Sequence, residues 1–298
     1  EALVGQRVWD RYGEQFPLLL KLIDASDVLS VQVHPDDDYA RQHGEPWGKT
    51  ESWYVFHAEP GSELIHGFNR FMDRDKVEAA IRANALSRYL HRMVVRAGDV
   101  VYVPAGMVHA IGKGVLLYEI QQRSDTTYRL YDWGRVGLDG RPRDLHVEQA
   151  LGVLDYAPWP EHRAAAVSVP LEDGRSYLVA CRHFALESWD VCGDMRSETD
   201  GESFNLITVA EGDVTVRYGP DGDEEVRLRY GETALLPAEL GWYMLRTVDR
   251  CRVLRAYVPD LWLDVISPLV HAGSSRESIR RLAGYGLQND LDALLVSL

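Results

Sequence analysis

The 298-residue chain carries 46 acidic residues against 32 Lys and Arg residues, which gives a formal net charge of −14. A strongly negative field repels nucleic acid phosphates and anionic lipids, so we expect neither class of partner. The sequence contains neither a membrane-spanning apolar run nor a basic-then-apolar signal pattern at its start. The three cysteines are far apart and form no CxxC pair, which predicts a reduced, cytoplasmic protein without a disulfide framework.

Apolar residues between about residue 16 and residue 257 occur mostly in short runs that Gly, Pro and Asp separate. Runs of this length with turn residues between them predict β-strands. The fold class that this pattern indicates is mainly β, a sandwich or jelly roll rather than a βαβ fold. The clearest predicted strands are residues 94–95, 100–103, 115–120, 206–209, 214–218, 233–236 and 253–258.

Helical periodicity is only local. Residues 75–90 carry apolar side chains near a 3.6-residue spacing, and residues 148–154 form a shorter pattern of the same kind. Near the C-terminus, Ser275 can cap a helix that runs through residues 279–283 and stops at Gly284, with a second short helix from about residue 290. We therefore predict a helical insertion near residues 75–90 and a short helical C-terminal tail.

A turn motif occurs twice in the chain at a constant spacing. Its first copy reads Gly98, five residues, Pro104, one residue, Gly106, two residues and His109. In the second copy a glycine and a proline lie 133 residues later (231 − 98 and 237 − 104), but Trp242 stands in place of the histidine. This repetition indicates two related β units, of which the second has lost a histidine.

A second match, upstream of the turn, relates residues 58–59 to residues 210–211 at an offset of 152 and would place Ser203 at the position of Glu51. The offsets differ by 19 residues, which fits the predicted helical insertion in the first unit. We predict a metal-binding catalytic unit at residues 1–156, a degenerate second unit at residues 170–258 and a helical tail at residues 259–298. The boundary between the two units should lie in residues 157–170.

Four polar side chains of the first unit form a candidate metal site. Gln32 and His34 alternate with Val31 and Val33, so both point to one face of a predicted strand. Such a pair is ordinary on an exposed strand face, but Glu51 and the turn histidine His109 extend it to two imidazoles, a carboxylate and an amide oxygen. This donor set suits Zn²⁺ and would also accept Mn²⁺, Fe²⁺ or Co²⁺.

Around these residues the sequence resembles a known family in four ordered blocks: FPLLLKLIDASDVLSVQVHPDDDYA, GKTESWYV, VPAGMVHAIGKG and EIQQRSDTTYRLYDW. The blocks are similar to consecutive blocks of type I mannose-6-phosphate isomerases, and the Gly-Pro-Gly-His turn is similar to the second motif of cupins. The likeness is clear from about residue 16 to residue 154 and weaker as far as residue 257. Because members of that family usually begin some tens of residues earlier, we expect a processed or truncated N-terminus.

The resemblance implies a tandem cupin that interconverts D-mannose 6-phosphate and D-fructose 6-phosphate with one zinc ion per chain. It implies that Gln32, His34, Glu51 and His109 bind the zinc. It also implies that Lys49 and Arg129 line the sugar-phosphate pocket. The expected partner is thus a small sugar phosphate, and the sequence predicts no oligomeric state.

Isomerisation through an enediol needs a base that moves a proton between two carbons. Glu119 is our candidate, because it lies beside the site in sequence and burial would raise the pKa of its carboxyl group. A structural carboxylate or a support for the metal is an equally open interpretation. Asp125 and Thr126 more simply form a turn that holds Arg129, the acidic run 36–38 a solvated turn, and the other eight histidines surface or packed residues.

Two alternatives to this function stay open from the sequence. The same metal site could isomerise another aldose phosphate, since the sequence does not show which C2 epimer fits. The chain could also be a non-catalytic, metal-containing cupin that binds sugar phosphates.

Overall fold

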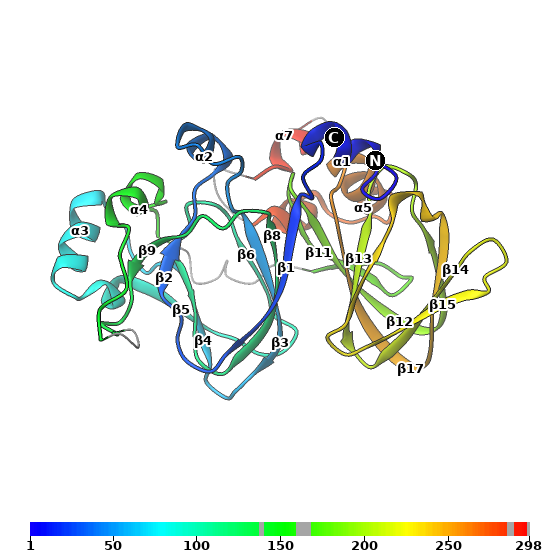
Figure 1. The fold of residues 1–298 in the computed structure, drawn as a ribbon, viewed down its shortest axis with the longest axis horizontal. Helices are drawn as coiled ribbons and strands as arrows, with labels where there is room; N and C mark the ends of the chain where they lie inside the picture. The colour runs from blue at the N-terminus through cyan, green and yellow to red at the C-terminus, as the bar shows by residue number, and fades with distance from the viewer. Residues whose placement is uncertain (137–139, 159–167, 285–288, 297–298) are drawn as a thin grey trace. The chain divides into compact units, whose positions relative to one another are not determined.

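The computed structural model describes residues 1–136, 140–158, 168–284 and 289–296. The protein is mainly β, as predicted, and its sheets are open rather than closed into a barrel. The chain forms two compact units (Figure 1). The N-terminal unit is Leu18–Ala165, and the C-terminal unit combines Glu1–Pro17 with Ala166–Leu298. Most of the predicted boundary, residues 157–170, lies outside the described residues.

The N-terminal unit contains two antiparallel sheets. One has the strand order β1-β8-β3-β6 and the other the order β5-β4-β7-β2-β9. Apolar side chains from both sheets, among them Trp53, Leu64 and Leu117, form a common buried cluster between them. The strands are β1 (Leu18–Ala25), β2 (Val31–Val33), β3 (Glu51–Ala58), β4 (Glu63–Phe68), β5 (Leu90–Val94), β6 (Val100–Val103), β7 (His109–Ile111), β8 (Val115–Gln122) and β9 (Tyr128–Tyr131).

Helices cover the other face of the five-stranded sheet. Val31 and Val33 of β2 pack there against residues of α3 (Arg74–Arg82) and α4 (Val147–Val153), which lie beside β9 in Figure 1. The predicted helix at residues 75–90 is shorter than expected, because Asn84 adopts a positive φ of 51° that ends the helical path. A 3-10 turn, η1 (Leu86–Tyr89), leads from there into β5, and α2 (Asp37–Gln42) follows β2.

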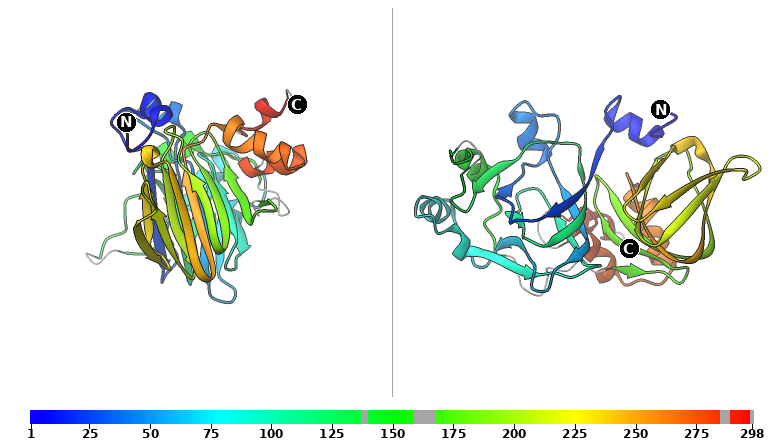
Figure 2. Two further views of the ribbon diagram at one scale, coloured as in Figure 1. Left: turned by 90° about the vertical axis from the view of Figure 1, so that its right-hand side faces the viewer. Right: turned by 60° about the horizontal axis from the view of Figure 1, so that its bottom comes forward.

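The C-terminal unit is built on one path of strands, β10-β11-β12-β17-β13-β16, from which β14 pairs with both β15 and β17. Its two longest strands, β12 and β17, pair along most of their length (Figure 2). Their register shifts at a bulge between Cys192 and Asp194. The strands are β10 (Val169–Pro170), β11 (Arg175–Ala180), β12 (Ala185–Glu198), β13 (Asn205–Glu211), β14 (Asp213–Tyr218), β15 (Glu224–Arg229), β16 (Thr233–Leu236) and β17 (Trp242–Tyr257).

Residues 1–17 belong to this C-terminal unit and not, as the predicted boundaries had it, to the first unit. The backbone carbonyl of Leu3 accepts a hydrogen bond from Ala238 N at 3.0 Å, and the ring of Phe16 lies 4.6 Å from that of Phe204. The short helix α1 (Gln6–Tyr12) lies within this segment. Ala2 and Leu3, which precede the helix, accept hydrogen bonds from η3 (Ala238–Leu240).

The C-terminal tail also packs into this unit. Its apolar residues share a buried cluster with Tyr177 of β11 and Tyr257 of β17, so the tail is part of the unit's core. Ser275 caps α6 as predicted, because its hydroxyl accepts from Ser278 N at 3.1 Å, and Gly284 follows with a φ of 75°. The tail contains η4 (Leu261–Ile266), α5 (Ser267–His271), α6 (Arg276–Arg280), η5 (Arg281–Ala283) and α7 (Asp292–Leu295).

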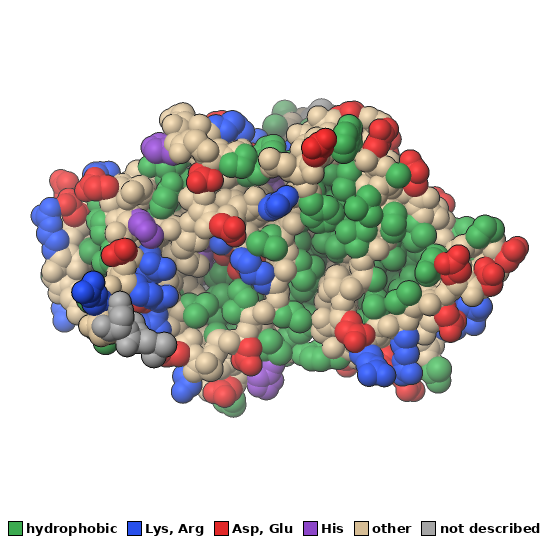
Figure 3. Space-filling view, in the orientation of Figure 1, with side chains coloured by type: hydrophobic (Ala, Val, Ile, Leu, Met, Phe, Trp, Pro, Cys, Tyr) green, Lys and Arg blue, Asp and Glu red, His purple; other side chains and the backbone are tan. Residues whose placement is uncertain are grey.

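Hydrophobic side chains gather over β13, β14 and β15 on the face shown in Figure 3. An apolar groove of about 230 Å³ lies there, lined by Val216, Tyr218, Val226, Ala234, Leu235, Leu236, Pro237 and Leu240. Along the described part of the chain, no helix is long and apolar enough to cross a membrane.

Candidate metal centre

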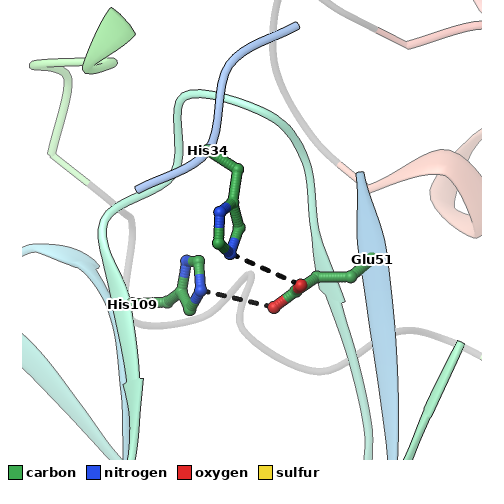
Figure 4. Close-up of side chains that lie close together, drawn as sticks. All are labelled: His34, Glu51 and His109. Atoms are coloured by element: carbon green, nitrogen blue, oxygen red, sulfur yellow. Dashed lines mark ion pairs between the residues drawn. The ribbon is translucent and has the colours of Figure 1, made fainter. Parts of the chain in front are cut away.

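Three of the four predicted metal ligands converge from two facing sheets. His34 directly follows β2, Glu51 begins β3 and His109 begins β7. Because side chains alternate along a strand, burying Val33 against the helices turns His34 toward the other sheet. The four-stranded sheet presents Glu51 to the same interior (Figure 4).

The Glu51 carboxylate faces both imidazoles. Its Oε2 is 3.5 Å from Nε2 of His34, and its Oε1 is 3.3 Å from Nε2 of His109 (Figure 4). The ligand atoms of the three residues lie within 4.8 Å of one another, and all three side chains are buried. No other group of three His, Cys, Asp or Glu side chains of this kind occurs among the residues that the structure describes.

The orientation of each imidazole is fixed by its outer nitrogen. His34 Nδ1 donates to the carbonyl of Thr126 at 2.9 Å, and His109 Nδ1 donates to that of Met107 at 2.8 Å. A carbonyl oxygen only accepts, so each ring carries its proton on Nδ1 and turns an unprotonated Nε2 toward Glu51. Metal-binding histidines are held in this way by their second nitrogen.

Burial keeps both rings neutral. It lowers the pKa of His109 to about 4, and the pKa of His34 falls well below its usual value through burial and the nearby Lys49 ammonium. Neutral imidazole is the form that binds a metal ion.

The site contains buried polar atoms with no hydrogen bond. Both carboxylate oxygens of Glu51 and Nε2 of His109 are in this state. An unsatisfied buried polar atom is costly, and a buried charge more so. A cation between two imidazoles and a carboxylate would satisfy all three atoms at once, so the residues present fit a metal ion.

Lys49 places its own charge at the edge of this group. Its Nζ donates to Nε2 of His34 at 3.1 Å and lies 3.2 Å from Oε2 of Glu51. The side chain is almost fully buried, so the ammonium partly offsets the charge of Glu51. The structure thus brings Lys49 together with the three predicted ligands.

The fourth predicted ligand, Gln32, is placed by backbone register alone. Gln32 lies opposite His109 on β7 and opposite Arg129 on β9. Cross-strand partners point to the same face of a sheet, which directs Gln32 toward the interior that holds His109. Its role as a ligand therefore stays a prediction.

Arg129, the predicted phosphate-binding residue, contacts the loop that follows β9. Its Nη1 donates to the carbonyl of Asp144 at 2.8 Å, whereas its Nε has no hydrogen-bond partner. The backbone of Arg129 lies beside that of Gln32, so the side chain starts from the strand next to the site.

Glu119 belongs to the interior face of the four-stranded sheet. Its Oε2 accepts from Trp53 Nε1 at 3.1 Å, and its Oε1 accepts from Lys21 Nζ at 3.0 Å. Burial raises the pKa of Glu119, the Glu51 charge raises it further, and Lys49 and Lys21 partly oppose the shift. The carboxyl group is thus a stronger base than a solvated one, as its predicted role requires.

The sequence analysis missed Lys21 and Trp53. Lys21 lies in β1 with apolar residues on both sides, which is an unusual place for a lysine and was a usable signal. Trp53 lies two residues after Glu51 and therefore on the same face of β3. Its ring meets that of His109 at a centroid distance of 5.4 Å.

Comparisons with known proteins identify the family of the chain. A model of the type I phosphomannose isomerase catalytic domain matches residues 1–67, and a model of the mannose-6-phosphate isomerase cupin domain matches residues 174–258. Mannose-6-phosphate isomerase ManA of Bacillus subtilis is 38% identical over 244 residues, which cover 81% of this chain and 75% of the relative. A mannose-6-phosphate isomerase of Streptococcus mutans is 40% identical over 223 residues, covering 74% and 68% of the two chains.

The same relationship holds for solved structures. The crystal structure of the Bacillus subtilis mannose 6-phosphate isomerase matches with a TM-score of 0.71 at 30% identity, covering 84% of this chain and 80% of that one. Sequence similarity over most of both chains, the matching fold and the converging ligand residues lead to one conclusion. The chain belongs to the type I mannose-6-phosphate isomerase family.

Proposed function

We propose that this chain interconverts D-mannose 6-phosphate and D-fructose 6-phosphate through an enediol. The names of its relatives support the substrate. The observation that carries the proposal is the buried Glu51 carboxylate, whose two oxygens accept no hydrogen bond and face the unprotonated nitrogens of two neutral imidazoles. This arrangement suits an isomerase that uses a metal ion, and nothing favours a non-catalytic binder.

The reaction relocates protons and needs no oxidant. A proton leaves C2 of the aldose and the C1 carbonyl oxygen gains one, which gives the enediol. The C2 hydroxyl then loses its proton as the C2 carbonyl forms, and C1 gains a proton. The site must therefore supply a base for carbon and groups that stabilise two neighbouring oxygens.

We assign one zinc ion per chain to Gln32, His34, Glu51 and His109. When bound, the ion supplies a positive charge that stabilises negative charge on the substrate oxygens. With only one carboxylate among its ligands, the site would keep a net positive charge. Metal dependence is general in this family, and zinc as the metal is our inference from the donor set.

Lys49 and Glu119 are the groups of this chain placed to handle protons. The Lys49 ammonium lies within 3.2 Å of both His34 and Glu51, so it can donate to a substrate oxygen beside them. Glu119 has the raised pKa of a base and is oriented by Lys21 and Trp53. We assign to Glu119 the transfer of the proton between C1 and C2 of the substrate.

Arg129 is our candidate anchor for the phosphate. Its planar guanidinium can hold two phosphate oxygens at once, and its Nε has no hydrogen-bond partner. Such a local cation overcomes the net charge of −14 for a small anionic substrate. The predicted setting of the reaction is the cytoplasm, and the predicted partner is the sugar phosphate.

Coupled assays with mannose 6-phosphate and glucose 6-phosphate, each with fructose 6-phosphate as the detected product, test this function. We expect turnover of the mannose substrate, loss of turnover after chelation and recovery with added Zn²⁺. Turnover of the glucose substrate alone would assign a different epimer. Binding of both substrates without turnover in the zinc-loaded protein would make the chain a sugar-phosphate binder.

A further inference from the structure

The short segment that carries Lys49 is held on both sides by a pair of side chains outside the metal centre. Asp37 Oδ1 accepts from Gly48 N at 2.8 Å and from Gln122 Nε2 at 2.8 Å. The amide oxygen of Gln122, Oε1, accepts from Thr50 N at 2.9 Å. The backbone amides on either side of Lys49 are thus tied to one connected pair of side chains.

This segment also packs tightly against the turn after His34. Lys49 N donates to the carbonyl of Pro35 at 2.9 Å. A Cβ atom on Gly48 would lie 2.4 Å from the carbonyl carbon of Asp36, so only glycine fits there. Gln122 is 3% exposed, which keeps its hydrogen bonds away from water. The backbone around Lys49 consequently has little freedom to move.

The acidic run 36–38 was predicted to be a solvated turn, and for Asp37 this is wrong. Asp36 caps α2, and Asp38 is largely exposed and pairs with Arg41. Only the middle carboxylate turns inward, toward Gly48 and Gln122. Three neighbouring aspartates thus have three different environments, which provides a matched control.

We propose that Asp37 and Gln122 are positioning residues that fix Lys49 against His34 and Glu51. Neither side chain needs to touch the substrate. Together they fix the amides at both sides of Lys49, and thereby the point from which its side chain reaches the centre. This inference rests on the proposed function only in that Lys49 acts on the substrate.

The first experiment compares Asp37→Ala with Asp38→Ala, which removes the same group from the same helix turn. Because misplacing a catalytic group by about 1 Å can cost on the order of 10²-fold, we expect Asp37→Ala to lower kcat/KM by about tenfold to 100-fold, mainly in kcat. Bound metal should stay unchanged, and Asp38→Ala should stay within about twofold of the parent. Equal kinetics for the two variants would overturn the proposal.

A double-mutant cycle with Lys49→Met asks whether Asp37 acts through Lys49. If it does, adding Asp37→Ala to Lys49→Met should leave the residual rate nearly unchanged. A further loss as large as in the parent would mean that Asp37 acts elsewhere.

Amide hydrogen exchange provides a measurement that does not depend on turnover. The Gly48 amide should exchange at least about tenfold faster in Asp37→Ala than in Asp38→Ala. If the protein proved inactive toward mannose 6-phosphate, the proposed function would fail while this exchange difference could still appear. An unchanged Gly48 exchange rate would instead overturn the positioning role, whatever the activity.

Discussion

The centre of the N-terminal unit and the equivalent position in the C-terminal unit lie on corresponding strands but differ in how their buried polar groups are satisfied. Strand register shows which residue of the C-terminal unit corresponds to Glu51. Glu51 pairs with Val103 on β6, Asn205 pairs with Leu236 on β16, and Val103 and Leu236 each precede one of the two matched prolines. Asn205 therefore occupies the position of Glu51.

Two sequence-based assignments in the second unit need correction. Ser203 was predicted at the position of Glu51, but the register offset is 154 (205 − 51), not 152. Trp242 was predicted in place of His109, yet Trp242 is partly exposed and the next residue, Tyr243, is fully buried. Because side chains alternate along β17, Tyr243 takes the inward position, and its hydroxyl accepts from Asn205 Nδ2 at 3.5 Å.

Each unit has an ion pair beside this position, and the acidic and basic residues have changed places between the two corresponding strands. Glu119 lies opposite Lys21 across β1 and β8, and Arg255 lies opposite Glu187 across β12 and β17. The N···O distance is 3.0 Å in both pairs. The same two strand positions thus carry an acid and a base in the first unit and a base and an acid in the second.

The difference lies in what remains unsatisfied. In the C-terminal unit, Glu187 accepts from Arg255, from the Tyr257 hydroxyl at 2.7 Å and from Trp189 Nε1 at 2.6 Å. In the N-terminal unit, the Glu51 oxygens accept no hydrogen bond. A buried network with all partners present rigidifies a core, whereas the Glu51 carboxylate, which the Lys49 ammonium offsets in part, faces two neutral imidazoles and can hold a further cation. Corresponding strand positions can therefore carry either a candidate metal centre or a closed hydrogen-bonded network, and the side chains decide which of the two forms.

The largest effect should come from Glu51→Gln, which preserves shape but removes the charge that distinguishes the two units. We expect bound zinc to fall from about one per chain to near zero. Losing several kcal/mol of electrostatic stabilisation should lower kcat/KM by about 10³-fold or more. Elemental analysis and the coupled assay measure both quantities. Tyr243→Phe at the equivalent centre should change neither, and full metal content in Glu51→Gln would exclude Glu51 as a ligand.

Glu119→Gln should produce the next largest loss. Removal of a positioned base costs on the order of 10² to 10⁴ in rate, so kcat should fall by that factor while zinc stays bound. Exchange of the substrate C2 proton with solvent deuterium should slow in parallel. The control is Glu63→Gln, which alters only a surface ion pair with Arg92. Loss of zinc in Glu119→Gln would instead make Glu119 a support for the metal.

Arg255→Met tests the closed network of the C-terminal unit. Breaking a buried pair leaves Glu187 uncompensated, so the free energy of unfolding should fall by about 3 to 5 kcal/mol. Denaturant unfolding measures this change, and zinc content in the N-terminal unit should persist. Replacing Glu187 with Gln in the same chain should restore part of the loss. A cost below about 1 kcal/mol for Arg255→Met would mean that the network is not a structural one.

Acid should destabilise the N-terminal unit more than the C-terminal unit, and this is the smallest of the expected effects. Burial lowers the pKa of His66, next to His109 in register, from 6.5 to about 4. Between these pH values the unfolded chain binds the proton and the folded one does not, so stability falls as pH falls, by about 3 kcal/mol for this one group. The lowered pKa of His109 acts in the same direction.

Unfolding of the metal-free protein at pH 7 and pH 4.5, followed by hydrogen exchange within each unit, measures this difference. The N-terminal unit should lose protection first, and His66→Phe should reduce the loss. The exposed His271 of α5, replaced by Gln, should have little effect. Equal acid sensitivity of the two units would contradict the lowered pKa values.

The strand faces and the turn that carries His109 could be predicted from the sequence, because both depend on residues close together in the chain. Alternation identified the β2 face, and the turn motif identified His109. Side-chain roles that depend on partners distant in sequence could not be predicted, as Lys21 beside Glu119 and Asp37 beside Gln122 illustrate. The offset error at Ser203 arose because the likeness of residues 58–59 to residues 210–211 is one of residue type and does not fix strand register. The bulges at Val55 and Val209, which lie 154 residues apart, support the offset of 154.

The metal content of the purified protein is the most direct test of the contrast between the two centres. Elemental analysis of the parent chain, with anomalous scattering to locate the ion in crystals, should find about one zinc per chain, bound by His34, Glu51 and His109. The position around Asn205 and Tyr243 should hold none. A ratio near two, an ion at Asn205, or a fully active protein without metal would contradict the assignment.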